Sequence, residues 1–150
     1  MGYISDLRKV VGSRPLIMVG ACVILLNKKN QILLQLRKDN HCWGLAGGSL
    51  EMGETLEQAA RRELFEETGL VANKFELFNV FSGEKFYYKY PHGDEVYNVV
   101  TAYICNDYSG ELKVDESEVQ KLSFFEPSQL PSNISSPDLP IIQAYIEKFL

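Results

Sequence analysis

The chain has 150 residues, of which 45% are hydrophobic and 23% charged, and its formal net charge at pH 7 is −5. A chain of this length buries about two thirds of its unfolded surface as one domain, so we expect a single domain over 1–150. The acidic balance argues against broad nucleic-acid binding and against attachment to anionic membranes, and leaves small phosphorylated ligands open.

The first predicted element is a buried strand over 16–26, where the sequence reads LIMVGACVILL. This run falls short of the roughly 20 apolar residues of a transmembrane helix, so we expect no membrane span. The polar stretch 27–30 joins it to a second strand over 31–37, which predicts a β-hairpin. No small-residue cleavage pattern precedes the first strand, and the three cysteines are widely spaced, so we expect a cytoplasmic protein with reduced thiols.

A helix is predicted after the glycine-rich passage 43–48. Thr55 and Gln58 form a capping-box pattern at its start, and Gly69 is the expected residue just past its end. Residues 56, 60 and 64 are Leu, Ala and Leu, which gives the helix a core-facing stripe. The helix therefore has a defined start, a defined end and one buried face.

Strands and a final helix are predicted in the second half of the chain. Alternating and aromatic segments predict strands over 75–81, 85–90, 95–105 and 122–125. The turn 91–94 pairs the second of these with the third, and apolar residues at 142, 145, 146 and 149 predict a helix that begins near Asp138. Strands flanked by helices predict an α/β fold in which a mixed sheet lies between helices.

Three glutamates, Glu63, Glu66 and Glu67, share one turn of the predicted central helix. Like charges at these spacings repel, and the helix dipole disfavours anions near a C-terminus, each effect costing about 0.2–0.5 kcal/mol. The arrangement therefore suggests a compensating divalent cation at a cleft edge beside the core stripe. The alternative, a solvated acidic helix face, is the more common meaning of three such acids taken alone.

The glutamates belong to a longer motif over 48–70, which reads GSLEMGETLEQAARRELFEETGL. It matches G-x5-E-x7-R-E-U-x-E-E-x-G-U, with U aliphatic, at every fixed position, and therefore resembles the Nudix box. The chance of such a match in a random chain of this length is about 10⁻⁷. The matching residues are Gly48, Glu54, Arg62, Glu63, Leu64, Glu66, Glu67, Gly69 and Leu70.

The resemblance implies a Nudix-type α/β/α sandwich that hydrolyses a nucleoside diphosphate linked to another group, with Mg²⁺ or Mn²⁺ as cofactor. Small nucleotides such as nucleoside triphosphates, ADP-ribose or dinucleoside polyphosphates are the implied substrates, and a nucleoside monophosphate plus a phosphorylated product the outcome. Two alternatives stay open: a nucleotide-sensing module that does not cleave its ligand, which predicts an eroded box, and a 5′-end RNA pyrophosphohydrolase, which predicts a basic groove.

Relatives often form dimers, so residues 1–14 are a candidate interface arm of a homodimer.

The resemblance also assigns metal ligands. Glu66 and Glu67 are implied ligands together with the carbonyl of Gly47, and Glu63 is either a ligand or the general base. Hard oxygen donors of this kind suit Mg²⁺. The family commonly has proline where this chain has Ala46, so we expect looser positioning of the Gly47 carbonyl without loss of activity.

Further catalytic roles follow from the same resemblance. Arg62 is expected to orient its neighbour Glu63. Glu54 is expected either to lie near the metals or to hold the loop against the helix. An additional acid from a late loop is Glu118 by our choice, as a ligand or base, and a solvated acidic loop is the alternative.

Substrate contacts are less defined by the sequence. Arg37 follows the second strand and is a candidate for a phosphate contact, with protection of a sheet edge as the alternative. Tyr87 and Tyr88 are candidates for stacking on a base, and their distance from the box resembles that of a tyrosine in diadenosine polyphosphate hydrolases. Core packing or cross-strand pairing is the alternative that we prefer for such aromatic residues.

Overall fold

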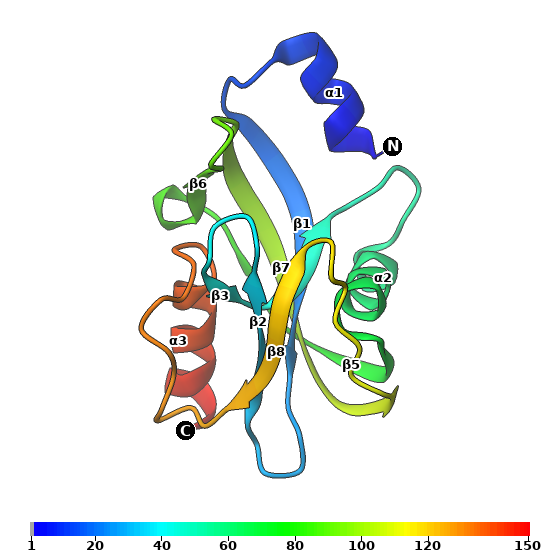
Figure 1. The fold of residues 1–150 in the computed structure, drawn as a ribbon, viewed down its shortest axis with the longest axis vertical. Coiled ribbons are helices and arrows are strands. Elements are labelled where there is room, and N and C mark those ends of the chain that lie inside the picture. Colours follow the sequence, from blue (N-terminus) through cyan, green and yellow to red (C-terminus); the bar gives the residue numbers. More distant parts are fainter. Residues whose placement is uncertain (1) are drawn as a thin grey trace.

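The computed structural model describes residues 2–150 and contains two β-sheets and three α-helices (Figure 1). In chain order the elements are α1 (Tyr3–Val11), β1 (Leu16–Leu25), β2 (Ile32–Arg37), β3 (Trp43–Gly44), β4 (Ala46–Ser49), α2 (Leu56–Thr68), β5 (Leu70–Phe81), the 3₁₀ turn η1 (Glu84–Phe86), β6 (Tyr87–Lys89), β7 (Glu95–Gly110), β8 (Val119–Phe125) and α3 (Leu139–Phe149). The larger sheet has the order β4-β1-β7-β5, with β6 paired to β7. Its β1–β7 pair is parallel and its other pairs are antiparallel, so the expected mixed sheet is confirmed.

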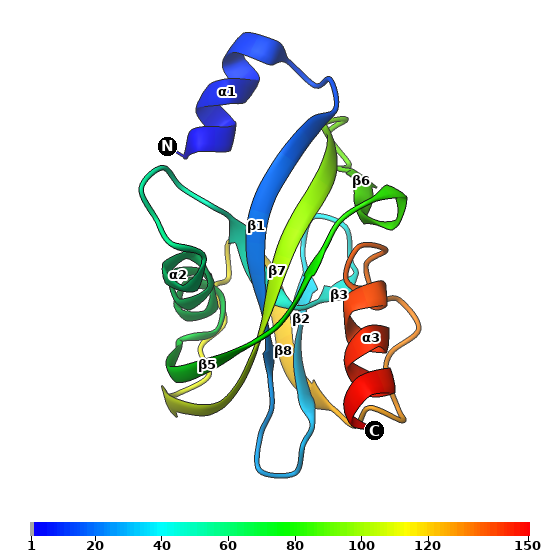
Figure 2. The same cartoon turned by 180° about the vertical axis from the view of Figure 1, so that it is seen from behind.

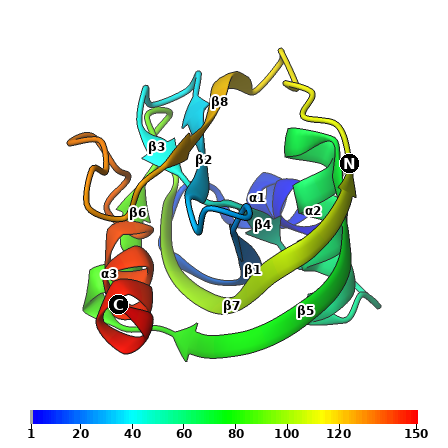
Figure 3. The ribbon, with the colours of Figure 1, turned by 90° about the horizontal axis from the view of Figure 1, so that it is seen from below.

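Strand β1 explains why the first apolar run is so long. Alternate residues of a strand point to opposite faces, and both faces of β1 are buried from Gly20 to Leu25, whereas Ile17 and Val19 are exposed. Val23 and Leu25 pack in the cluster under α2, which also contains Leu64, whereas Ile24 packs in the cluster that contains Ile142 of α3. Figure 3 shows α2 and α3 on opposite sides of the central strands, which confirms the α/β/α sandwich.

The first two strands do not form the predicted hairpin. The turn 27–30 joins them as expected, but only the bridge Leu26↔Ile32 pairs the two segments. Beyond it β1 pairs with β4 and β7, while β2 pairs with β3 and β8 in a separate three-stranded antiparallel sheet. The strands diverge because both edges of β1 are taken by other partners.

The second half of the chain keeps its predicted order of elements, but the predicted strand 85–90 is wrong at its start, where Glu84–Phe86 form η1 and only Tyr87–Lys89 form β6. Strands β6 and β7 pair across a turn in which the Tyr90 N–H donates to the Asp94 carbonyl at 2.8 Å. Strand β5 begins at Leu70, directly after the central helix, earlier than the predicted 75–81. The C-terminal helix begins at Leu139 after Asp138, and Ile142 and Tyr145 are buried on its inner face, as its spacing predicts.

The N-terminal residues form a helix that sequence patterning does not predict. Figure 2 shows α1 beyond the end of β1, apart from the other two helices. Arg8 holds it in place, since its guanidinium donates to the Glu95 carbonyl at 2.6 Å and lies 3.5 Å from Asp94. The N–H of Tyr3 donates to Glu51 Oε1 at 2.8 Å. Met1, the first residue of the candidate interface arm, lies outside the described residues.

Two predictions about the whole chain can be compared with the structure. All three cysteines are free thiols, with Cys22 and Cys105 buried, as predicted. Within residues 2–150, no helix combines the length and the apolar character that a membrane crossing requires.

Candidate functional site

The central helix α2 begins and ends as its sequence predicts. Thr55 Oγ1 accepts from the Gln58 N–H at 3.1 Å, and Gln58 Oε1 accepts from the Thr55 N–H at 2.9 Å, which completes the capping box. At the other end Gly69 has φ 80°, a left-handed conformation that glycine adopts without strain, and its N–H donates to the Phe65 carbonyl. These two ends fix the helical turn that carries the glutamates.

Arg62 ties this helix to the loop before it. Its guanidinium donates to both oxygens of Glu54, Nε to Oε2 at 2.6 Å and Nη2 to Oε1 at 2.8 Å. The same group donates to the Ser49 carbonyl at 3.1 Å and to Glu63 Oε1 at 2.7 Å, and lies 3.6 Å from Glu66 Oε2. Arg62 therefore lowers the pKa of Glu54, chiefly through the hydrogen bond between their side chains. A paired, bidentate arginine of this kind gives geometric rigidity as well as charge compensation.

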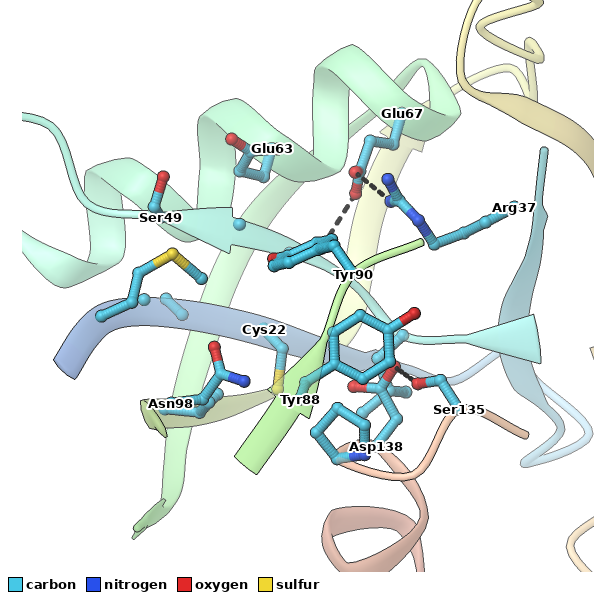
Figure 4. Close-up of a pocket in the computed structure, with 18 of the residues that line it drawn as sticks. Cys22, Arg37, Ser49, Glu63, Glu67, Tyr88, Tyr90, Asn98, Ser135 and Asp138 are labelled. Carbon is cyan, nitrogen blue, oxygen red and sulfur yellow. Dashed lines mark hydrogen bonds and ion pairs between the residues drawn. The ribbon is translucent and has the colours of Figure 1, made fainter. Parts of the chain in front are cut away.

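Glu67 is a buried carboxylate with a side-chain exposure of 3%. Its Oε1 accepts from the Gly47 N–H at 2.9 Å, and its Oε2 lies 3.7 Å from Nη1 of Arg37 (Figure 4). Burial, followed by the nearby charge of Glu63, raises the pKa of Glu67 to about 8. Arg37 and the Gly47 N–H oppose this shift without cancelling it, so ionised Glu67 is a charge that the surrounding protein does not fully compensate.

Glu63 lies one helical turn before Glu67 and faces the same strand. Burial raises the pKa of Glu63 even though Arg62 donates to it. A Cβ atom at Gly48 would lie 2.5 Å from the carboxyl carbon of Glu63, and a Cβ atom at Gly47 would lie 2.4 Å from the Ala21 carbonyl oxygen. Only glycine at position 47 lets β4 lie this close to the backbone of β1.

These residues have the donor chemistry for a hard divalent cation, but they do not form a complete ligand shell. Within residues 2–150, no group of three or more His, Cys, Asp or Glu side chains is arranged to hold a metal ion as it stands. Arg62 engages Glu63, the Gly47 N–H engages Glu67, and the Glu66 side chain is 54% exposed. The buried Glu67 and the half-buried Glu63, both with raised pKa values, nevertheless fit a cation such as Mg²⁺, which would lower both pKa values.

A pocket of about 340 Å³ extends from these carboxylates to the N-terminus of α3 (Figure 4). This volume is within the range of small-molecule sites. Of the residues predicted from the sequence, it is lined by Arg37, Gly47, Glu63, Glu67, Tyr88 and Glu118. Glu54, Arg62, Glu66 and Tyr87 are not among the described residues that line it.

The two candidate tyrosines lie differently, since neighbouring residues of a strand point to opposite faces. The hydroxyl of Tyr88, in the pocket wall, accepts from Nδ2 of Asn40 at 2.7 Å. The Tyr87 ring packs against Tyr97 with centroids 5.2 Å apart, and its hydroxyl donates to Glu95. The structure thus brings Tyr88 to the pocket and pairs Tyr87 across strands.

The inner end of the pocket carries residues that sequence patterning does not identify. Asp138, predicted only as the start of a helix, turns its carboxylate to Ser135, whose Oγ donates to Oδ2 at 2.6 Å. Burial raises the pKa of Asp138 to about 6. Tyr90 and Asn98 also line the pocket (Figure 4). No local signal marks these residues, because an acid before a proline-containing helix start is typical of a cap, and the strands that bring the group together are distant in the sequence.

Comparison with known proteins identifies similar chains. A family model described as "NUDIX domain" matches residues 16–145. A protein of Bacillus subtilis (strain 168), named as a candidate 8-oxo-dGTP diphosphatase, is 37% identical over 112 residues, which cover 75% of this chain and 68% of that protein. An ADP-ribose pyrophosphatase of Methanocaldococcus jannaschii is 37% identical over 111 residues, covering 71% of this chain and 61% of the relative.

The fold comparison agrees with these sequence matches. The crystal structure of a MutT NUDIX hydrolase from Burkholderia pseudomallei superimposes with a TM-score of 0.73 at 26% identity, covering 85% of this chain and 97% of the other. The α/β/α arrangement with a mixed sheet is therefore found in a solved structure of similar size. The matched part of this chain spans about two thirds of the length of the two relatives from Bacillus and Methanocaldococcus.

Proposed function

The chain belongs to the Nudix family, and from that premise we propose that it is a divalent-metal-dependent pyrophosphohydrolase. Its substrates are small nucleotides in which a nucleoside diphosphate is linked to another group, and its products are a nucleoside monophosphate and a phosphorylated remainder. The observation that carries the proposal is the pair Glu63 and Glu67, which lies one helical turn apart against the Gly47–Gly48 backbone at one end of a substrate-sized pocket.

We assign the cofactor, Mg²⁺ or Mn²⁺, to Glu63, Glu66, Glu67 and the Gly47 carbonyl. When bound, the cation neutralises phosphate oxygens and lowers the pKa of water, both of which hydrolysis of a phosphoanhydride requires. The clamp between Arg62 and Glu54 holds the preceding loop against α2, and the Arg62 bond to the Ser49 carbonyl ties α2 to β4. Side-chain rotation alone brings the exposed Glu66 toward the other two acids, because all three lie on one turn.

The remaining roles concern protons and phosphate charge. A water oxygen forms a bond to phosphorus while the bridging P–O bond breaks and its electron pair leaves with the departing phosphate. A carboxylate must accept the proton that this water loses, and Glu63 and Glu118, which both line the pocket, are the candidates. Arg37 lines the same end and supplies positive charge for phosphate oxygens.

The nucleoside portion is assigned to the inner end of the pocket. Tyr88 and Tyr90 offer aromatic faces for a base, and the Asp138 carboxylate offers acceptors for base N–H groups. The names of the relatives point to two substrates to test first, 8-oxo-dGTP and ADP-ribose.

Three broader statements belong to the same proposal. Residues 1–150 act as one Nudix domain, with the box at 48–70. The protein works in the cytoplasm, where its three free thiols stay reduced. It pairs as a homodimer that involves α1, on whose surface Val10 is 82% exposed; sedimentation of the wild-type chain as a monomer at micromolar concentration would contradict this last statement.

The test is a substrate panel assayed with Mg²⁺ and with Mn²⁺. The panel contains the four nucleoside triphosphates, 8-oxo-dGTP, ADP-ribose, a nucleotide sugar, a diadenosine polyphosphate and a triphosphorylated RNA, with products separated by chromatography. We expect a nucleoside monophosphate from at least one small nucleotide. Glu66→Gln should remove most turnover, whereas Glu57→Gln, an exposed acid on the same helix, should retain it. Nucleotide binding by the folded protein without any product would instead support a sensing module.

A further inference from the structure

A glutamine interrupts the aliphatic core of strand β2. Residues 32–34 are Ile, Leu and Leu, all buried, and the next residue, Gln35, is only 1% exposed. A buried amide is unfavourable unless both its oxygen and its nitrogen are hydrogen-bonded. Side-chain Oε1 of Gln35 has no hydrogen-bond partner, and among residues 2–150 it is the one buried side-chain nitrogen or oxygen of which this is true.

The nitrogen of the Gln35 amide faces hydrogen-bond acceptors. Nε2 donates to the Leu45 carbonyl at 3.4 Å. The Gln35 amide also lies near Glu67, where it favours the ionised carboxylate and opposes the rise in its pKa. Leu45 precedes by two residues the Gly47 whose N–H donates to the same carboxylate. Gln35 therefore donates to the backbone segment that holds the buried acid, and lies near the acid itself.

These contacts fix the orientation of the amide. Rotating it by half a turn would place Oε1 against the Leu45 carbonyl, and an amide oxygen cannot donate to that acceptor. The unpartnered Oε1 is thus the consequence of keeping Nε2 on the side of Glu67. A leucine would fill the same space without leaving a buried polar atom unpartnered, so packing alone does not explain a glutamine here.

We propose that Gln35 is a positioning residue, which holds the Glu67 carboxylate and the Leu45–Gly47 backbone in the geometry that a divalent cation requires. The inference rests on the proposed function, because Glu67 is one of the assigned ligands. Groups that orient a ligand without touching the cation typically change metal affinity or activity by 10–100-fold when they are removed. Gln35 is expected to act at this level and chiefly through Glu67.

The test measures Mn²⁺ binding to the full chain by the electron paramagnetic resonance signal of free Mn²⁺, without substrate. The variants are Gln35→Leu and the nearly isosteric Gln35→Met, so that a failure of one to fold leaves the other. Leu33→Met is the matched control, since Leu33 is buried on the same face of β2 two residues earlier. Each Gln35 substitution is repeated in a Glu67→Gln background to show whether its effect passes through Glu67.

We expect the Gln35 variants to weaken Mn²⁺ binding by 10–100-fold and to unfold no more easily than the wild type, with Leu33→Met unchanged. In the Glu67→Gln background the same substitutions should have less than a twofold effect. Wild-type affinity in Gln35→Leu or Gln35→Met, or an undiminished effect in the Glu67→Gln background, would overturn the positioning role. A wild-type chain that binds Mn²⁺ but hydrolyses nothing contradicts the proposed function alone, whereas one that binds no Mn²⁺ contradicts both.

Discussion

Replacing the buried Glu67 by glutamine should stabilise the protein when no divalent cation is present. The ordinary pKa of a glutamate here is 4.5, and burial beside Glu63 raises the pKa of Glu67 to about 8 in the folded chain. A raised carboxyl pKa means that the folded state holds its proton more tightly, so the penalty is absent below pH 4.5 and grows as pH rises toward 8. At pH 7 the penalty amounts to about 3 kcal/mol, and at pH 5 to less than about 1 kcal/mol.

Urea unfolding in the presence of a chelator measures this penalty. Glu67→Gln cannot ionise, so its free energy of unfolding should exceed that of the wild type by about 3 kcal/mol at pH 7 and by less than about 1 kcal/mol at pH 5. Saturating Mg²⁺ should narrow the gap at pH 7, because the cation stabilises the ionised wild-type carboxylate. Glu57→Gln, on the exposed face of the same helix, should change stability little at either pH. A Glu67→Gln variant that is less stable than the wild type at pH 7, or equally stabilised at both pH values, would refute this reasoning.

Three other substitutions test the architecture around the glutamates. Arg62→Lys keeps the charge but loses the two-point contact with Glu54, so we expect a loss of about 1–3 kcal/mol in urea unfolding and at least about tenfold lower turnover. Gly48→Ala places a methyl group 2.5 Å from the carboxyl carbon of Glu63, and this side chain can move aside; turnover should fall at least about tenfold with near-native circular dichroism, and wild-type turnover would contradict the assignment of Glu63. Thr55→Ala removes the cap of α2 and should cost about 1 kcal/mol in urea unfolding, with KM unchanged.

The parts of the fold that the sequence predicts are those set by local rules. The capping box and Gly69 define α2 to within a residue, because each end depends on atoms a few positions apart. The pairing partners of β1 are not predictable in this way. A long apolar run indicates that both faces of the strand are buried. It does not show whether the strand pairs with its hairpin neighbour or with β7, whose paired residues lie 80 positions later in the sequence.

The residues of the candidate site also differ in whether local spacing predicts them. Glu63 and Glu67 are identified by spacing within one helix, and the structure places both in the pocket. Asp138 and Gln35 are missed because their surroundings come from distant segments: Asp138 lines the same pocket as Glu63, and Gln35 lies near Glu67. The local sequence explains each in an ordinary way, Asp138 as the start of a helix and Gln35 as a residue of a strand.

Helix α1 was missed for a different reason. Its residues contact the rest of the chain mainly through polar groups, among them Arg8 with the Glu95 carbonyl and the Tyr3 N–H with Glu51. None of its residues is fully buried. Sequence patterning detects buried apolar faces well, and it has little to say about a short helix held by hydrogen bonds to backbone atoms.

The central claim is that Glu67 and a divalent cation together make this pocket a pyrophosphohydrolase. Phosphorus NMR of the best small-nucleotide substrate, incubated with the wild type and with Glu67→Gln, in Mg²⁺ and in chelator, tests it most directly. We predict conversion to a nucleoside monophosphate and a phosphorylated product by the wild type in Mg²⁺ only, and a loss of at least about 100-fold in the variant although it is folded. Hydrolysis that survives the chelator, or a Glu67→Gln variant as active as the wild type, would contradict the account.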